Sequence, residues 1–233
     1  MQARLPESGH HPRSNPVSLN SNSLERLVPD HLAPGDVTGH ETLELHLERY
    51  RFAARHARAG RLLDIACGVG YGTRLLRDES RQVDFALGVD LCAESVAYAH
   101  ERYGRDGVDY RVGDAMQFED PEGFDTIVCL ETVEHLPCPD RLIDNLVSLL
   151  CPDGVLVASV PTTPSVDVNP HHRHDFTERS FRHLFAQQPL EECACLRQAQ
   201  PFGVASTLRR SEARLAELRP NLLRYYATRP GAA

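Results

Sequence analysis

The sequence predicts an α/β fold in which one doubly wound, mostly parallel sheet carries helices on both faces. The main observation is that short runs rich in Val, Ile and Leu alternate with segments of helical periodicity over residues 62–160. Such near-continuous apolar runs are typical of strands that are buried on both faces. The second observation is a glycine-rich turn directly after the first of these runs. With 233 residues, the chain is long enough to bury one sizeable core.

The expected elements follow one another regularly up to residue 160. Residues 41–57 have apolar side chains at helical spacing and predict a helix before the first strand, with Thr38 as its candidate N-cap. Strands are expected at 62–66, 84–90, 108–114, 124–131 and 154–160, and helices after the glycine-rich turn, at 92–103 and at 140–150. The later, weaker pattern predicts a helix at 177–187, strands near 190–198 and 201–206, and Arg-rich helical stretches at about 208–228.

Composition divides the chain into three parts. Residues 1–38 contain five prolines among many Ser and Asn, which predicts a mobile leader that buries little apolar surface. Residues 39–206 are the predicted folded domain, and residues 207–233 are a predicted Arg-rich helical tail. Charge is also uneven, because residues 84–140 carry 14 acidic residues against three Arg, whereas residues 206–233 carry six Arg against two Glu. We interpret the acidic middle as a solvated surface and the basic tail as a surface helix.

Composition also argues against several classes of protein. The formal net charge is -8 and all 25 basic residues are Arg, which disfavours a broad nucleic-acid-binding surface. The seven cysteines show no C-x-x-C spacing, so we expect reduced cysteines in the core rather than disulfides or a structural zinc cluster. No segment approaches the ~20 apolar residues of a membrane span, and the N-terminus lacks the apolar part of a secretory signal. We therefore expect a cytoplasmic protein that does not bind membranes.

The strongest motif is the turn LLDIACGVGYGT at residues 62–73. Its glycines Gly68, Gly70 and Gly72 permit tight backbone geometry and allow a ligand to approach main-chain N–H groups. A dinucleotide-binding turn would have its third glycine at the position of Thr73, so a nicotinamide cofactor is disfavoured. We expect a valine in place of Gly70 to weaken ligand binding, because its side chain would occupy ligand space.

Three acidic residues lie at the carboxyl ends of the first three expected strands. Asp64 supplies an anion to which a cationic amine could bind, and Asp90 can accept hydrogen bonds from both hydroxyls of a ribose. Asp114 and the Ala115–Met116 backbone can contact the edge of an adenine, while the side chain of Met116 or Phe118 covers its face. An acid at a strand end is often only a helix cap. Three such acids in register favour a ligand that contains adenosine.

These motifs resemble those of the class I S-adenosylmethionine-dependent methyltransferases over about residues 45–200. The resemblance rests on DIACGVGYGT, on GDAMQF and on the fourth and fifth strands, FDTIVCLETVEHL and LCPDGVLVASVP. It implies S-adenosylmethionine as the cofactor and a Rossmann-like sheet of seven strands in the order 3-2-1-4-5-7-6. The cofactor-binding residues that it implies are Asp64, Gly68, Gly70, Asp90, Leu91, Asp114, Ala115, Met116 and Glu131.

A second group of polar residues follows the fourth and fifth strands. Residues 131–135 read E-x-x-E-H, which on a starting helix would present Glu131, Glu134 and His135 to one side, and residues 171–176 add several histidines. Two carboxylates with one or two imidazoles suit a divalent cation such as Mg, Mn, Fe or Zn. The predicted metal ligands are Glu131, Glu134, His135 and His174. In a site without metal, the candidate general bases are His135, His172 and His174.

The E-x-x-E-H and H-x-F pattern resembles the metal-binding set of the small-RNA 3′-end 2′-O-methyltransferases, and a related E-x-x-E-H occurs in the ubiquinone-biosynthesis O-methyltransferases. The likeness to the RNA enzymes is incomplete. The stretch that follows their metal histidine is shortened here to HDFTERSF, and the chain has no basic RNA-binding extension apart from the Arg-rich tail. The N-P-x-H…F-T loop is more similar to small-molecule and sugar O-methyltransferases.

The favoured function is therefore methyl transfer to a small-molecule acceptor, with a hydroxyl group of a sugar or natural-product intermediate as the expected target. One alternative is metal-dependent 2′-O-methylation of an RNA 3′ end, against which the net charge counts. The other is a cofactor-binding interaction protein without catalysis, because a fold alone does not establish a reaction. The sequence determines neither the choice between O- and N-methylation nor the oligomeric state.

Overall fold

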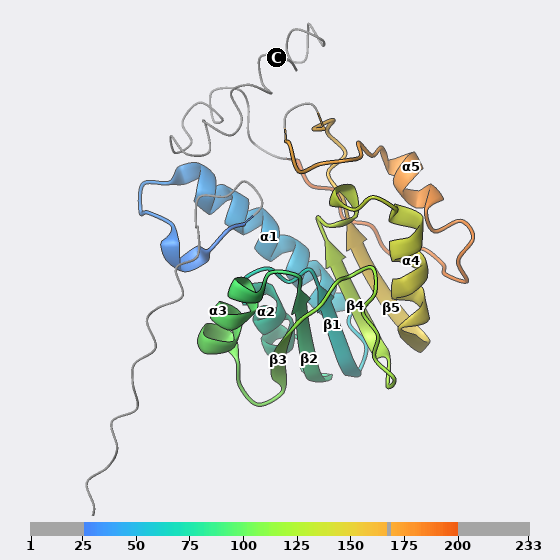
Figure 1. The fold of residues 1–233 in the computed structure, drawn as a ribbon, viewed down its shortest axis with the longest axis horizontal. Coiled ribbons are helices and arrows are strands. Elements are labelled where there is room, and N and C mark those ends of the chain that lie inside the picture. Colours follow the sequence, from blue (N-terminus) through green and yellow to red (C-terminus); the bar gives the residue numbers. More distant parts are fainter. Residues whose placement is uncertain (1–25, 167–168, 200–233) are drawn as a thin grey trace, which may run out of the picture.

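The computed structural model describes residues 26–166 and 169–199. Its strands form one parallel sheet in the order β3-β2-β1-β4-β5 (Figure 1). The strands are β1 (Gly60–Ile65), β2 (Val83–Asp90), β3 (Val108–Val112), β4 (Phe124–Leu130) and β5 (Leu150–Ser159). Because the strands are parallel, all of their carboxyl ends meet at one edge of the sheet. The predicted α/β class and parallel sheet are confirmed.

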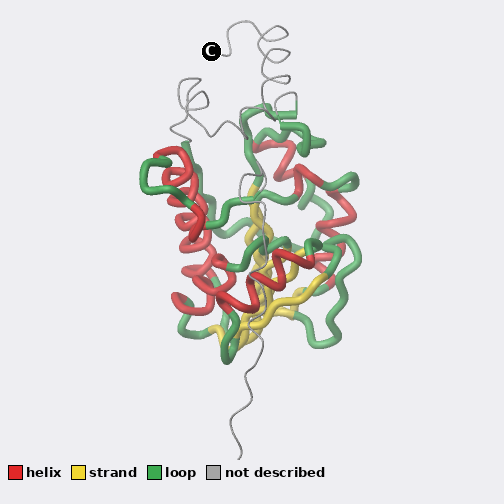
Figure 2. Tube along the Cα trace, turned by 60° about the vertical axis from the view of Figure 1, so that its left-hand side comes forward, coloured by secondary structure: helices red, strands yellow, loops and turns green. Residues whose placement is uncertain are grey.

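Helices cover both faces of this sheet, and Figure 2 shows helical segments on either side of the strands. The helices are η1 (Pro29–His31), α1 (Val37–His56), α2 (Tyr71–Glu79), α3 (Ala93–Tyr103), η2 (Val133–His135), α4 (Pro139–Ser148) and α5 (Glu178–His183). Neighbouring residues of β1 point to opposite faces. Leu62 packs in one core cluster with Ala53 of α1 and Leu76 of α2, whereas Leu63 packs in another with Leu142 of α4.

The predicted seven-strand order is confirmed for its first five strands. The described residues contain five strands in the order 3-2-1-4-5. The strand expected at 201–206 and the helical stretches expected at 208–228 lie outside the described part of the chain.

The strand expected near 190–198 is wrong, because these residues have no regular secondary structure. Ion pairs with α5 hold this segment instead. Arg182 pairs with Glu192 at 2.7 Å, and Arg197 pairs with Glu178 at 2.6 Å. The side chains of this segment pair with charges on α5. They do not alternate between a buried and an exposed face, as the side chains of a strand do.

The start of α1 differs from the predicted cap. Asp36 is the N-cap residue, and its carboxylate accepts a hydrogen bond from the Gly39 N–H at 2.8 Å. Thr38 is a buried residue inside the helix, so its prediction as N-cap is wrong. Residues 1–25 of the predicted leader lie outside the described residues, whereas the part next to α1 is folded and buries Val28 against Val69.

The cysteines are all free, as predicted, but they are not all core residues. Cys67 and Cys129 are buried, while Cys138, Cys193 and Cys195 are exposed. Among the helices of the described residues, none combines the length and apolar character that a membrane span needs.

Candidate functional site

The glycine-rich turn connects β1 to α2 through an irregular backbone. Ala66, Gly68 and Gly70 have positive φ angles of 59°, 57° and 87°. A left-handed alanine costs about 1 kcal/mol, and strained backbone of this kind gathers at ligand sites. A Cβ atom added at Gly68 would meet no atom within 4 Å, so this glycine faces open space. The turn therefore leaves room for a ligand beside Gly68.

The space beside Gly70 is filled by the protein itself. A Cβ atom at Gly70 would lie 2.6 Å from the Ala99 Cβ and 2.7 Å from the Tyr110 ring, and the Tyr110 hydroxyl donates a hydrogen bond to the Gly70 carbonyl at 2.8 Å. The expectation that a valine at this position would occupy ligand space is therefore wrong, because the side chain would collide with α3 and β3.

Asp64 is a buried acid at the carboxyl end of β1, with 1% of its surface exposed. The Thr73 hydroxyl donates a hydrogen bond to the Asp64 carboxylate at 2.6 Å. Burial raises the pKa of Asp64 to about 7, against the opposing effect of hydrogen bonds from Thr73 and Tyr50. Gly72 makes room for this arrangement, since a Cβ atom there would overlap the Tyr50 ring. The acid is therefore poised between its neutral and charged forms near neutral pH.

Asp90 connects the ends of β1 and β2. Its carboxylate accepts hydrogen bonds from the Gly68 N–H at 2.8 Å and from the Cys92 N–H at 2.9 Å, one on each oxygen. Each carboxylate oxygen has further acceptor capacity, so the side chain can still bind a diol. Leu91, the next residue, is 72% exposed.

Asp114 organises the loop after β3. Its carboxylate accepts hydrogen bonds from the Met116 N–H at 2.9 Å and from the Gln117 side chain at 3.1 Å. The Ala115 carbonyl accepts a hydrogen bond from the Asn145 side chain at 3.0 Å, which ties this loop to α4. Ala115 and Met116 pack partly buried against the core. The three segments that follow β1, β2 and β3 thus lie along one edge of the sheet.

Glu131 is the first residue after β4 and has a left-handed backbone, with φ of 49°. The Ser159 hydroxyl donates a hydrogen bond to its carboxylate at 2.7 Å, and Arg49 of α1 pairs with it at 3.6 Å. The expected helix start at Glu131 is wrong, because only the short 3-10 helix η2 forms, from Val133 to His135. Glu131 therefore faces α1 and β5.

The structure brings Glu134, His135 and His172 together, with one potential ligand atom from each within 4.8 Å of the others. Glu134 is 1% exposed, and the rings of His135 and His172 stack edge to face with centroids 4.7 Å apart. The Ser165 hydroxyl lies 2.6 Å from His172 Nδ1 and holds this ring. His174 is not part of this group of three. Its Nε2 is hydrogen-bonded to the Leu136 carbonyl at 2.9 Å. Of the predicted metal ligands, Glu134 and His135 join this cluster.

The inner face of α1 adds residues that the sequence analysis missed. His46 Nδ1 and the Tyr71 hydroxyl are hydrogen-bonded at 2.7 Å, Arg49 pairs with Glu131, and Tyr50 approaches Asp64. Burial, with a smaller effect of the Arg49 charge, lowers the pKa of His46 to about 3, so this ring is neutral. Positions 46, 49 and 50 have the spacing of one helix face, which is the signal that could have identified them.

Comparisons with known proteins agree with this geometry. Residues 63–158 match a family model described as a methyltransferase domain. The chain is 30% identical over 175 residues to a Mycolicibacterium smegmatis protein named "Probable S-adenosylmethionine-dependent methyltransferase", a match that covers 67% of this chain and 66% of that protein. It is 38% identical over 112 residues to the ubiquinone biosynthesis O-methyltransferase of Xanthomonas campestris pv. campestris, which covers 46% of each chain. The chain thus spans about half the length of the second relative and less than two thirds of the first.

Two solved structures share the fold. A chain of the Haloferax volcanii complex that contains the Trm112 methyltransferase activator has a TM-score of 0.59 at 18% identity, covering 82% of this chain and 89% of that chain. The YcgJ protein of Bacillus subtilis has a TM-score of 0.52 at 22% identity, covering 61% of this chain and 66% of that chain. At these identities the likeness concerns the fold alone.

Proposed function

Because the chain belongs to the class I superfamily of S-adenosylmethionine-dependent methyltransferases, we propose that it transfers the methyl group of this cofactor to a hydroxyl group of a small molecule. The observation that carries the proposal is the Asp90 carboxylate, which joins the Gly68 and Cys92 amides at the tips of β1 and β2. A ribose can bind at this carboxylate, and the open side of Gly68 leaves space for the rest of the ligand.

The remaining cofactor contacts follow from the same edge. The Asp64 carboxylate would bind the ammonium group of the methionine, and the Asp114–Met116 segment would contact the adenine. Glu131 would lie beside the cofactor, where Arg49 and Ser159 hold its carboxylate in place. η2 and the loop containing His172 would border the side of the site at which the acceptor binds.

The transfer itself is a displacement at the methyl carbon. When bound, the cofactor would supply an electrophilic methyl group: the acceptor oxygen would displace sulfur, which would keep the electron pair of the broken bond, and the acceptor hydroxyl would lose its proton. Alignment of the acceptor supplies much of the rate, and a nearby base can take up the proton. In a site without metal, His135 and His172 would accept it. His174, the third candidate base, has its Nε2 hydrogen-bonded to the Leu136 carbonyl and would position the loop.

A divalent cation fits the Glu134, His135 and His172 cluster, because one carboxylate oxygen and two imidazole nitrogens are typical ligands. When bound there, such a cation would lower the pKa of the acceptor hydroxyl. Ser165 would hold the His172 ring through its hydrogen bond to Nδ1, as second partners of metal-binding histidines commonly do.

The choice of a hydroxyl acceptor is supported by the ubiquinone-biosynthesis O-methyltransferases among the relatives. The test is to incubate the protein with S-adenosylmethionine carrying a labelled methyl group and with separate panels of phenols, sugars and short RNAs. We expect label on an oxygen of a phenol or sugar. Label on the RNA 3′ end would instead favour the RNA alternative, and label on nitrogen would contradict the O-methyltransferase assignment.

Cofactor affinity should rise with pH up to about 7. Burial raises the pKa of Asp64 to about 7, so below this pH its carboxyl group is neutral and does not pair with the methionine ammonium, which stays charged below about pH 8. We expect Kd to increase about tenfold per pH unit below 7, measured by calorimetry. The matched variant Asp64→Asn should bind weakly without this pH dependence. A wild-type Kd that is constant with pH would contradict the role of Asp64.

The stability of the ligand-free protein should fall as pH rises, whereas the affinity for the cofactor should rise. Asp64 keeps its proton up to about pH 7 in the folded state, whereas in the unfolded chain it ionises near its ordinary pKa of 3.8. The folded state therefore binds more protons between these values, and its free energy of unfolding should fall as pH rises from about 4 to about 7. Urea unfolding of wild type and Asp64→Asn at several pH values isolates this contribution.

Metal binding should depend on His172 and not on His174. The protein is loaded with Mn²⁺ or Zn²⁺, dialysed, and its metal content is measured by mass spectrometry together with activity after chelation. His172→Ala should lose the metal because it removes a ligand of the cluster, whereas His174→Ala should retain it because that ring binds Leu136. Equal metal content in both variants would contradict the cluster. Full activity without metal would leave the histidines as general bases.

A further inference from the structure

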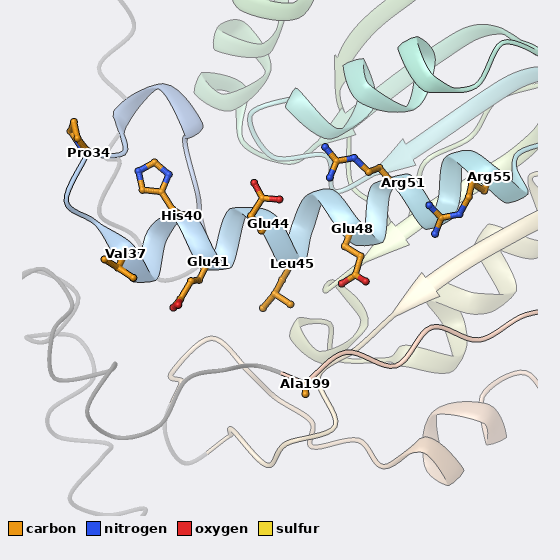
Figure 3. A pocket seen from close by; sticks show the side chains of 10 residues that line it. All are labelled: Pro34, Val37, His40, Glu41, Glu44, Leu45, Glu48, Arg51, Arg55 and Ala199. Carbon is orange, nitrogen blue, oxygen red and sulfur yellow. The ribbon is translucent and has the colours of Figure 1, made fainter.

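The outer face of α1 lines a groove. It is the face opposite His46, Arg49 and Tyr50. The groove has a volume of about 840 Å³. The first half of α1 lines it with Glu41, Glu44 and Glu48 and with the apolar side chains of Val37 and Leu45. Arg51 and Arg55 line its other end, where Arg51 pairs with Glu79 at 3.4 Å. Val37 is 65% exposed. Figure 3 shows Glu41, Leu45 and Glu48 on the side of the helix toward Ala199.

The described chain ends at this groove. Gln198 donates hydrogen bonds to the Leu45 carbonyl at 3.1 Å and to the Glu48 carboxylate at 2.5 Å, and it accepts one from Arg49 at 3.2 Å. Ala199, the next residue, lines the groove itself. The last described residues, Gln198 and Ala199, therefore lie on α1.

The sequence that follows complements the groove in charge and in pattern. Residues 206–233 contain six Arg against two Glu, opposite in sign to the three glutamates on the first half of α1. The leucines Leu208, Leu215, Leu218 and Leu222 are spaced by seven, three and four residues, which is typical of one face of a helix. Acidic lining also disfavours a nucleic acid as the occupant.

The connecting segment is long enough for the chain to return along α1. Leu208 is nine positions after Ala199, a stretch of chain that spans up to about 30 Å when extended. The part of α1 between Val37 and Glu48 is only about 16 Å long. A segment that starts near residue 208 can therefore reach every residue of the groove.

We propose that residues 208–222 of this chain dock on the α1 groove, with their leucines against Val37 and Leu45 and their arginines against the glutamates. The docked segment covers the apolar part of the groove and neutralises its acidic rim. Burial of the leucines supplies stability, and the opposite charges set the orientation.

Charge reversal in the full-length protein tests this proposal. One variant carries Glu41→Arg and Glu44→Arg, a second carries Arg210→Glu and Arg214→Glu, and a third combines all four changes. Amide hydrogen exchange of α1 reports docking. Each double variant should speed exchange about fivefold, because exposed ion pairs contribute modestly, and the combined variant should restore the wild-type rate. Glu101→Arg, an exposed site on α3, is the matched control and should leave α1 unchanged.

A fluorescent reporter gives a second measurement. The sequence contains no tryptophan, so Val37→Trp introduces one unique fluorophore at the groove. Its emission should be blue-shifted in the full chain and should move to the red when Arg210→Glu and Arg214→Glu are added. Unchanged exchange and emission in both double variants would overturn the proposal. Exchange rates that increase on dilution would also overturn it, because the occupant would then be a second copy of the chain.

Discussion

Replacing Gly70 by valine should lower the thermal unfolding midpoint by about 10 °C. The added side chain would collide with Ala99 and Tyr110, and overpacking of this kind costs about 1–3 kcal/mol. The left-handed backbone, with φ of 87°, adds about 1–2 kcal/mol for a residue with a Cβ atom. Differential scanning calorimetry of the ligand-free protein measures the effect.

Gly68→Ala is the matched control for this prediction. Its backbone is also left-handed, with φ of 57°, but a Cβ atom there would meet no atom within 4 Å. We expect a loss of about 1 kcal/mol from backbone strain alone, together with weaker cofactor binding because the methyl group enters the open space. Equal losses of stability in the two variants would show that packing against Tyr110 is not what requires glycine at position 70.

Replacing Asp90 by alanine should raise the Kd for S-adenosylmethionine at least about 100-fold. Hydrogen bonds to a charged acceptor contribute about 1.5–3 kcal/mol each, and the variant loses both ribose contacts. It also frees the Gly68 and Cys92 amides that the carboxylate now holds. Isothermal titration calorimetry measures the change.

The control for this prediction lies on the same strand. Asp84 is exposed near the opposite end of β2, so Asp84→Ala should bind the cofactor as wild type does. Asp90→Asn should fall between wild type and alanine, because its amide keeps one acceptor oxygen. Unchanged affinity in Asp90→Ala would contradict both the ribose contact and the proposed cofactor site.

The sheet was predictable because its strands carry a strong apolar signal. β1, β2 and β4 each bury four consecutive residues, so both faces are covered, and such runs are recognisable without tertiary information. The segment at 190–198 lacked that signal. Its conformation depends on ion pairs with Arg182 and Glu178, residues that are distant in sequence from their partners and whose pairing no local pattern predicts.

The acceptor side of the site was less predictable than the glycine-rich turn. The E-x-x-E-H spacing assumed an α-helix, whereas the left-handed backbone at Glu131 separates this residue from Glu134 and turns it toward Arg49. The choice between His172 and His174 depends on how a loop folds back on η2. Arg173 and His174 both donate backbone hydrogen bonds to the Glu134 carbonyl, a long-range contact that sequence spacing does not reveal.

The 20-residue helix α1 borders two different sites on its two faces. Its inner face places His46, Arg49 and Tyr50 against Tyr71, Glu131 and Asp64, respectively, while its outer face lines the groove. Neighbouring side chains of a helix move with their common backbone, so a ligand on one face that shifts α1 changes the free energy of binding on the other. Thermodynamic reciprocity then requires the two effects to be equal in size. If docking on the groove shifts α1, it would change the affinity for the cofactor by the same factor by which the cofactor changes docking, with α1 as the shared element.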